Sequence, residues 1–245
     1  MLKSFSRHAV SAPLTLALIE RFRAMPDLKR LSVLLLFYIT PLAAVDLENG
    51  EEINEVCAGC HGEFGQGGKE GEYPRLAGMP APFIARQLHL FRDRKRPNLA
   101  MVEYVDDRQM PDNDIQDISY FLQGIRLKTK LPPADEKAPG FNAYQRLLES
   151  KQLMQIPRAP GDQQVGRTLY RKECASCHGS EGWGRDDKAV PMLAGQYTNY
   201  LWRQVKKYRE GVRIHDPDAP EDRLLLDFKD EELRDIFAYL SIVDD

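Results

Sequence analysis

The stretch Cys57-Ala58-Gly59-Cys60-His61 occurs twice in this 245-residue chain, the second time as Cys174-Ala175-Ser176-Cys177-His178. Two thiols three residues apart on one helical turn can each form a thioether with a different vinyl group of one porphyrin. The histidine that follows each pair then lies below the iron as its axial ligand. Both runs together use all four cysteines of the chain. They predict two covalently bound haem c groups, held by Cys57, Cys60 and His61 and by Cys174, Cys177 and His178.

Other uses of paired cysteines fit this pattern less well. A C-x-x-C pair also occurs in thioredoxin-like redox sites, and two such pairs can together hold zinc. Zinc ribbons usually bring their pairs within a few tens of residues of each other, whereas 117 residues separate Cys57 from Cys174. A dithiol redox site does not need a histidine directly after the second cysteine. The repeated histidine therefore favours haem attachment.

The first 45 residues have the pattern of an export signal. An apolar run at 31–39 follows Lys29 and Arg30 and leads to Ala43 and Ala44, small residues that suit signal peptidase. We expect residues 1–45 to be removed by cleavage near Ala44, and the long stretch before the run makes Met25 a candidate for the true start. The alternative is an uncleaved membrane anchor, but the run is shorter than the roughly 20 apolar residues that a bilayer span needs. Export to the bacterial periplasm also suits haem attachment, which takes place outside the cytoplasm.

The charge of the exported part is clearly negative. The whole chain has 34 basic and 37 acidic residues, and the part after residue 45 keeps 28 and 35 of them, for a net charge of −7. Such a charge argues against nucleic acid and anionic membranes as partners. It favours redox proteins with a positive docking surface, and membrane contact only through those partners unless the signal segment stays attached.

An internal repeat divides the exported part into two domains. At an offset of 117 residues, the first haem run, Pro74 and Gly78 fall on the second haem run, Pro191 and Gly195. A period of this length indicates a duplicated domain, because solenoid repeats are about 20–50 residues long. We therefore expect domains at 46–127 and 163–245.

Each domain shows apolar residues at helical spacing and no alternating run typical of a strand. The closing helices are expected to begin at Asp112 and Asp230, acidic residues suited to capping a helix N-terminus. The proline-rich linker at 128–162 contains helical spacing between Phe141 and Met154, and a connection of this length is expected to pack across both domains. The fold class is therefore all-α, with two tandem domains joined by a long, partly helical linker after an N-terminal signal segment.

The duplicated C-x-x-C-H-G is followed, thirteen residues after each histidine, by P-x-L-A-G, then by a glutamine-containing helix and a closing helix with an acidic start. This arrangement resembles the cytochrome c4 family of dihaem electron carriers over nearly the whole exported chain. The resemblance implies a small class I cytochrome c fold for each domain, with the haems near the inter-domain contact. It also implies that the carbonyls of Pro74 and Pro191 accept the ring N–H of the proximal histidines, which orients those rings.

The resemblance further implies a methionine as sixth ligand, between the two later helices of each domain. Met101 lies at that place in the first domain, and an iron–thioether bond raises the reduction potential. Met110 is the alternative, although its counterpart Phe228 indicates a core position. Most methionines are core residues in any case.

The second domain departs from this pattern, because Asp218 or Ala219 stands where the methionine is expected. His215, three residues earlier, is the only strong iron ligand in that window. We hypothesise that His178 and His215 together ligate the second iron, which would then have the lower potential. Met192 or Met154 as ligand, and a five-coordinate iron, remain the alternatives.

Two functions of different classes follow. The first is a periplasmic electron carrier between a quinol-oxidising complex or dehydrogenase as donor and a terminal oxidase or reductase as acceptor. The second is a small-molecule oxidoreductase, or its cytochrome subunit, acting on thiosulfate, sulfide or peroxide at an open or exchangeable second haem. The sequence shows no nucleophile–base pair, phosphate-binding glycine loop or acidic metal cluster, so no catalytic residue is assigned.

Overall fold

The computed structural model describes residues 44–106, 108–154, 156–216 and 224–243. The chain divides into two units, Met1–Ala44 and Val45–Asp245, and the fold described here is that of the second. The expected signal segment lies outside the described residues except for its last two. In the described part the fold is all-α, as predicted, with isolated β-bridges in place of any strand. None of the described helices is both long and apolar enough to cross a membrane.

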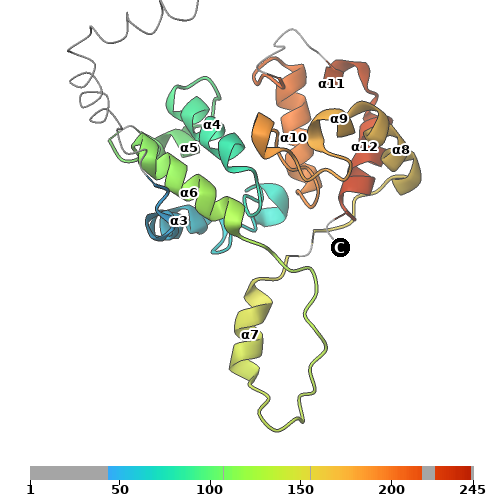
Figure 1. The fold of residues 1–245 in the computed structure, drawn as a ribbon. Coiled ribbons are helices and arrows are strands. Elements are labelled where there is room, and N and C mark those ends of the chain that lie inside the picture. Colours follow the sequence, from blue (N-terminus) through green and yellow to red (C-terminus); the bar gives the residue numbers. More distant parts are fainter. Residues whose placement is uncertain (1–43, 107, 155, 217–223, 244–245) are drawn as a thin grey trace, which may run out of the picture. The chain divides into compact units, whose positions relative to one another are not determined.

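Both repeats run from an opening helix through a short 3-10 helix and a middle helix to a closing helix, but the opening helix of the second repeat is divided into α8 and α9 (Figure 1). The first repeat consists of α3 (Leu47–His61), η2 (Lys69–Gly71), α4 (Ala81–Arg92), α5 (Leu99–Tyr104) and α6 (Asp112–Gly124). The linker carries α7 (Ala143–Lys151). The second repeat consists of α8 (Gln163–Glu173), α9 (Ala175–His178), η3 (Asp186–Lys188), α10 (Thr198–Arg209), α11 (Leu224–Asp227) and α12 (Asp230–Leu240).

The first and last helices of each repeat cross in close contact, α3 on α6 and α8 on α12. A glycine lies at each crossing. A Cβ atom on Gly50 would come within 2.6 Å of the Asp117 carbonyl oxygen, and one on Gly166 would overlap the Asp235 carbonyl oxygen. Only a residue without a side chain lets the two backbones approach this closely.

An aspartate N-cap fixes the start of both opening helices. The Asp46 carboxylate accepts the backbone N–H groups of the first turn of α3, and Asp162 does the same for α8. The backbone N–H of Asp46 donates to Oδ1 of Asp117 at 2.9 Å, and that of Asp162 to Oδ1 of Asp235 at 2.8 Å. The cap therefore also ties each opening helix to its closing helix.

The closing helices begin where the sequence predicted, but their aspartates do not cap them. The N-cap positions are Pro111 and Lys229, so Asp112 and Asp230 are the first helical residues. In the first turn their charges interact favourably with the helix dipole. Asp112 also pairs with Arg92 at 2.9 Å, and Asp230 with Arg209 at 2.6 Å. The predicted helix starts are confirmed and the predicted capping role is wrong.

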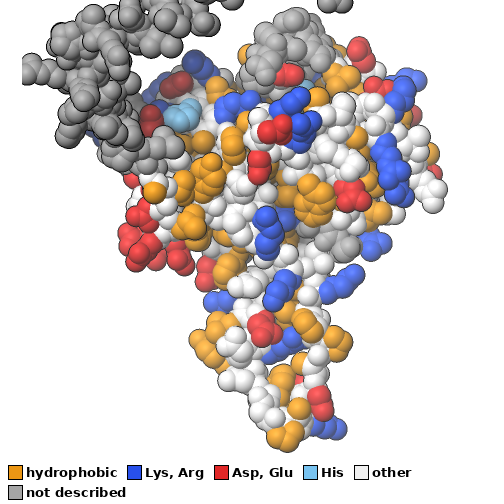
Figure 2. Space-filling view, viewed as in Figure 1, with side chains coloured by type: hydrophobic (Ala, Val, Ile, Leu, Met, Phe, Trp, Pro, Cys, Tyr) orange, Lys and Arg blue, Asp and Glu red, His pale blue; other side chains and the backbone are white. Residues whose placement is uncertain are grey.

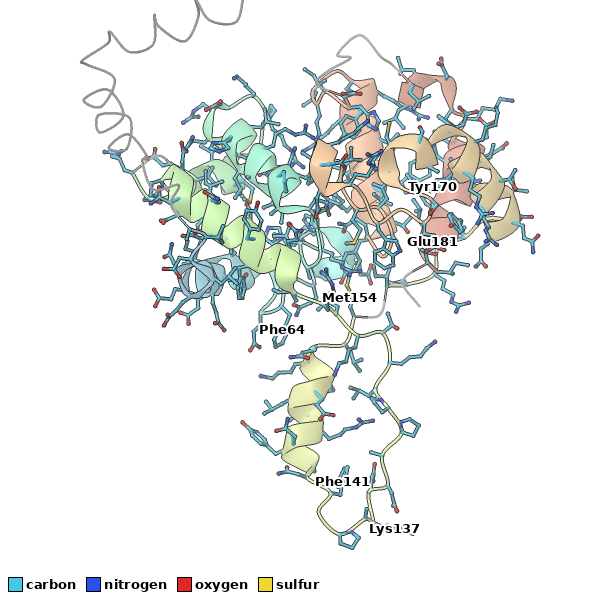
Figure 3. All side chains as sticks on the ribbon, in the orientation of Figure 1. Phe64, Lys137, Phe141, Met154, Tyr170 and Glu181 are labelled. Atoms are coloured by element: carbon cyan, nitrogen blue, oxygen red, sulfur yellow. The ribbon has the colours of Figure 1, made fainter. Side chains whose placement is uncertain are left out.

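The hydrophobic core extends across the boundary between the repeats. One cluster lies within the second repeat around Tyr170, which is fully buried and donates its hydroxyl to the Gly179 carbonyl at 2.8 Å (Figure 3). A second cluster combines Met79 and Leu122 of the first repeat with Met192 of the second. The two repeats therefore share apolar surface, which suits domains of about 80 residues, a size that buries little surface alone.

A backbone hydrogen bond joins two segments of the linker, and α7 between them is exposed. The Met154 backbone N–H donates to the Lys128 carbonyl at 2.9 Å, and the Met154 side chain is buried (Figure 3). Tyr144 and Leu147 of α7 are 69% and 58% exposed. The helix itself is confirmed, but its apolar residues do not pack across both domains as expected.

Two candidate haem sites

Each cysteine–histidine run lies at the end of a helix. The helix α3 ends at His61 and α9 ends at His178, and the next residues, Gly62 and Gly179, have φ values of 81° and 84°. A glycine in this left-handed region is the usual way to stop a helix. Both histidines are buried, whereas the thiol-bearing residues Cys60 and Cys177 are exposed. Each site therefore combines a buried imidazole with a thiol at the protein surface.

The rings of both proximal histidines are held by the expected proline carbonyls. Nδ1 of His61 lies 3.0 Å from the Pro74 carbonyl oxygen, and Nδ1 of His178 lies 3.0 Å from that of Pro191. A carbonyl can only accept, so Nδ1 carries the proton and Nε2 is left with a free lone pair for iron. Burial lowers the pKa of His61, and it lowers that of His178 to about 4, against the smaller opposite effect of the proline carbonyls. Both rings are therefore neutral at pH 7, the form that binds a metal.

The loops that carry the two prolines are built alike. The Leu76 N–H donates to the Gly65 carbonyl and the Leu193 N–H to the Gly182 carbonyl, each at 2.7 Å. In these loops the structure reproduces the repeat seen in the sequence.

Before haem is attached, the first and more buried cysteine of each run is a protonated thiol at neutral pH. Burial raises the pKa of Cys57 and of Cys174 to about 11. None of the four cysteines forms a disulfide. Addition of an S–H group across a vinyl double bond gives a thioether, and a pair of free thiols beside a buried imidazole is the donor set that this attachment needs.

The candidate sixth ligand of the first site lies at the edge of a core cluster. Met101 belongs to α5 and is half-buried against Phe91, Val105, Met110 and Ile115. Met110 is a buried member of that cluster, as expected for a core residue. Met101 as an iron ligand remains a prediction.

In the second site, the structure brings His215 to the proximal histidine. The ring centroids of His178 and His215 are 6.0 Å apart, with 41° between the ring planes. The Tyr208 ring packs edge-on against His215 at 5.2 Å. Imidazole nitrogens bind a metal ion at about 2 Å, so rings with centroids 6.0 Å apart are close enough to bind one ion between them. The spacing fits a shared iron, while Asp218 and Ala219 lie outside the described residues.

A group of arginines and glutamines joins the repeats and suits the acidic edge of the haems. Arg96 and Arg213 each donate to the glutamine of their own repeat, Gln87 at 2.9 Å and Gln204 at 2.7 Å. Each also donates to the other glutamine, at 3.3 Å from Arg96 and 3.0 Å from Arg213. These partners are neutral, and in the described part Nε of Arg86 is buried without a partner. Haem propionates are anions, so arginines whose partners are neutral are suited to pair with them.

Sequence reasoning did not assign this arginine–glutamine group. The signal was present, because Gln87 and Arg96 fall on Gln204 and Arg213 at the offset of the repeat. Their meeting across the repeats could not be inferred from that alignment, since a repeat relates equivalent positions without showing which ones touch.

Several known proteins are similar to this chain in sequence or fold. The family model described as Cytochrome c matches residues 47–126 and 163–244. A protein named cytochrome c4 from Pseudomonas aeruginosa is 27% identical over 190 residues, covering 77% of this chain and 84% of the relative. One from Stutzerimonas stutzeri, named thiosulfate dehydrogenase electron acceptor, is 28% identical over 195 residues, covering 76% and 78%. The crystal structure of reduced cytochrome c4 from Pseudomonas stutzeri matches with a TM-score of 0.62 and 22% identity, covering 81% of this chain and 98% of that one.

Proposed function

This chain belongs to the dihaem cytochrome c4 family, and on that basis we propose that it carries single electrons between redox proteins in the periplasm. Each of its two domains holds one covalently bound haem c. The haem iron supplies a one-electron Fe(III)/Fe(II) couple, and the protein sets its potential and its access to partners.

The proposed ligand sets differ between the two domains. His61 and Met101 are assigned to the first iron, and His178 and His215 to the second. A thioether ligand raises the potential relative to a second imidazole, so an electron rests on the first haem. Residues 46–127 and 163–245 are proposed as the two haem domains, 128–162 as the linker and 1–45 as the cleaved signal segment.

One observation carries the choice of a carrier over an enzyme. His215 faces the proximal His178 at a ring separation of 6.0 Å. A side chain in the sixth position leaves no site at which a small substrate binds iron. In this proposal His215 takes the iron position that the alternative function needs open.

Carbon monoxide distinguishes the two functions. The reduced carrier is expected to bind it at neither haem, because both irons have two protein ligands. Rapid binding at one haem would contradict the carrier function and support an open catalytic position. A wild-type protein that carries fewer than two haems would contradict both functions.

We propose that a redox partner docks near the first haem of this chain through a basic surface of its own. Figure 2 shows acidic side chains gathered over α3, the helix that leads to Cys60. Four exposed glutamates belong to it: Glu48, Glu51, Glu52 and Glu55. Opposite charges on two partners speed their encounter and are screened by salt. Electron transfer to a basic partner is therefore expected to slow as ionic strength rises.

A second candidate concerns the donor. The relative from Stutzerimonas stutzeri is named an electron acceptor of thiosulfate dehydrogenase, and we propose a thiosulfate-oxidising enzyme as one donor for this chain. Thiosulfate alone should leave the oxidised protein unchanged, and addition of such an enzyme should reduce it. Reduction by thiosulfate alone would instead indicate that the chain is itself the dehydrogenase.

A further inference from the structure

A single peptide unit connects the first proximal histidine to the second repeat. The carbonyl of Pro74 accepts the ring N–H of His61 at 3.0 Å. The N–H of the same peptide unit, which belongs to Arg75, donates to Oε1 of Gln196 at 3.0 Å. Nε2 of Gln196 donates back to the Arg75 carbonyl, also at 3.0 Å. Arg75 and Gln196 are 4% and 2% exposed, so water does not compete for these bonds.

The second proximal histidine has the same connection with a different acceptor. The Pro191 carbonyl accepts from His178 at 3.0 Å, and the N–H of that peptide unit, on Met192, lies 3.2 Å from Sδ of Met79. In the repeat, Met192 falls on Arg75 and Gln196 falls on Met79. The two contacts are therefore equivalent, and they differ in whether an amide oxygen or a thioether sulfur receives the N–H.

This difference affects the histidine at the far end of the chain of bonds. An amide oxygen is a full hydrogen-bond acceptor and a thioether is a weak one. Hydrogen bonds in a chain polarise one another, so a peptide whose N–H is well bonded has a more negative carbonyl. A more negative carbonyl draws the Nδ1 proton and makes the histidine a more basic ligand. A more basic ligand favours Fe(III) and lowers the reduction potential.

We infer that Gln196 is a positioning residue for the first haem, lowering its potential from the neighbouring repeat through the Pro74–Arg75 peptide. Met79 leaves the second haem without this effect. The inference rests on the proposed carrier function and deepens it. Met101 raises the reduction potential of the first haem, and Gln196 lowers it toward that of the second haem. The gap between the haems is thereby smaller than their axial ligands alone would set.

The test exchanges the two acceptors in the haem-containing protein. Gln196→Met is expected to raise the potential of the first haem only, and Met79→Gln to lower that of the second only. In each variant the equilibrium ratio of the electron's occupancy on the first haem to that on the second should rise severalfold. A tenfold change in this ratio corresponds to about 59 mV for a one-electron couple. The potentials are read by spectroelectrochemistry and assigned by NMR of the two proximal histidine rings.

Gln123→Met is the matched control. Gln123 also joins the repeats, and its Oε1 also accepts a backbone N–H, that of Ala81 at 2.8 Å, but this peptide holds no histidine. Its potentials should equal those of the wild type. If both acceptor variants keep two haems and unchanged potentials, or shift both haems equally, the inference is wrong while the carrier function stands. Absence of haem from the wild type would overturn both.

Discussion

The imidazole of His215 lies 6.0 Å from that of His178, centroid to centroid, although 37 residues separate them in the sequence. The ring of Tyr208 packs edge-on against that of His215. This pair is one feature that distinguishes the second haem site from the first, where the sixth ligand is proposed to be a methionine.

Replacement of His215 should therefore open the second site. In His215→Ala the second haem is expected to change from low spin to high spin and to bind carbon monoxide, because its iron loses one of two ligands. The first haem should keep its spectrum. His89→Ala is the control, since His89 contacts Arg92 on the surface of α4. An unchanged low-spin spectrum for His215→Ala would rule out this ligand.

Two methionines of one cluster should behave differently. Met101→Ala is expected to open the first haem to carbon monoxide with a small loss of stability, because Met101 is half-buried. Met110→Ala should leave the ligation intact and cost about 2–5 kcal/mol of unfolding free energy, as for other buried methionines. Absorbance spectra and thermal unfolding of both variants measure this. The reverse result would make Met110 the ligand.

The helix crossing of the second domain predicts a strong effect of one methyl group. Gly166→Ala places its Cβ against the Asp235 carbonyl, so α8 and α12 must separate. We expect a loss of about 1–3 kcal/mol or more. Gly124→Ala is the control, because a Cβ there meets nothing within 4 Å. Denaturant unfolding compares the two variants, and equal stability would contradict the close crossing.

The arginine pair between the repeats should raise both haem potentials. A cation near the propionates opposes the extra positive charge of the ferric state, so Arg96→Gln and Arg213→Gln are expected to lower the potentials. Arg126→Gln serves as control, since Arg126 is exposed and bonds its own segment at the Gln123 carbonyl. Unchanged potentials in both variants would show that these arginines do not face the haems.

Local chemistry made much of this molecule predictable. The haem runs, the repeat and the starts of α6 and α12 depend on short motifs and helical periodicity, which are readable from neighbouring residues. The proline carbonyls followed from the family resemblance, and the structure shows them at the predicted histidines.

The features that were missed depend on contacts between distant segments. Gly50 and Gly166 are 116 residues apart, one fewer than the offset of the haem runs, so the repeat did not align them. The same holds for the caps Asp46 and Asp162. Helical spacing predicted α7, but spacing alone does not show whether an apolar face has a partner. The meeting of Gln196 with Arg75 likewise depends on how the repeats pack.

A redox titration of the wild-type protein, followed by electron paramagnetic resonance, directly tests the two ligand sets proposed for the haems. It should show two separate one-electron steps from two low-spin haems, the higher with His/Met and the lower with His/His signals. A high-spin second haem in the resting protein, or two haems with the same ligand signature, would contradict these ligand sets.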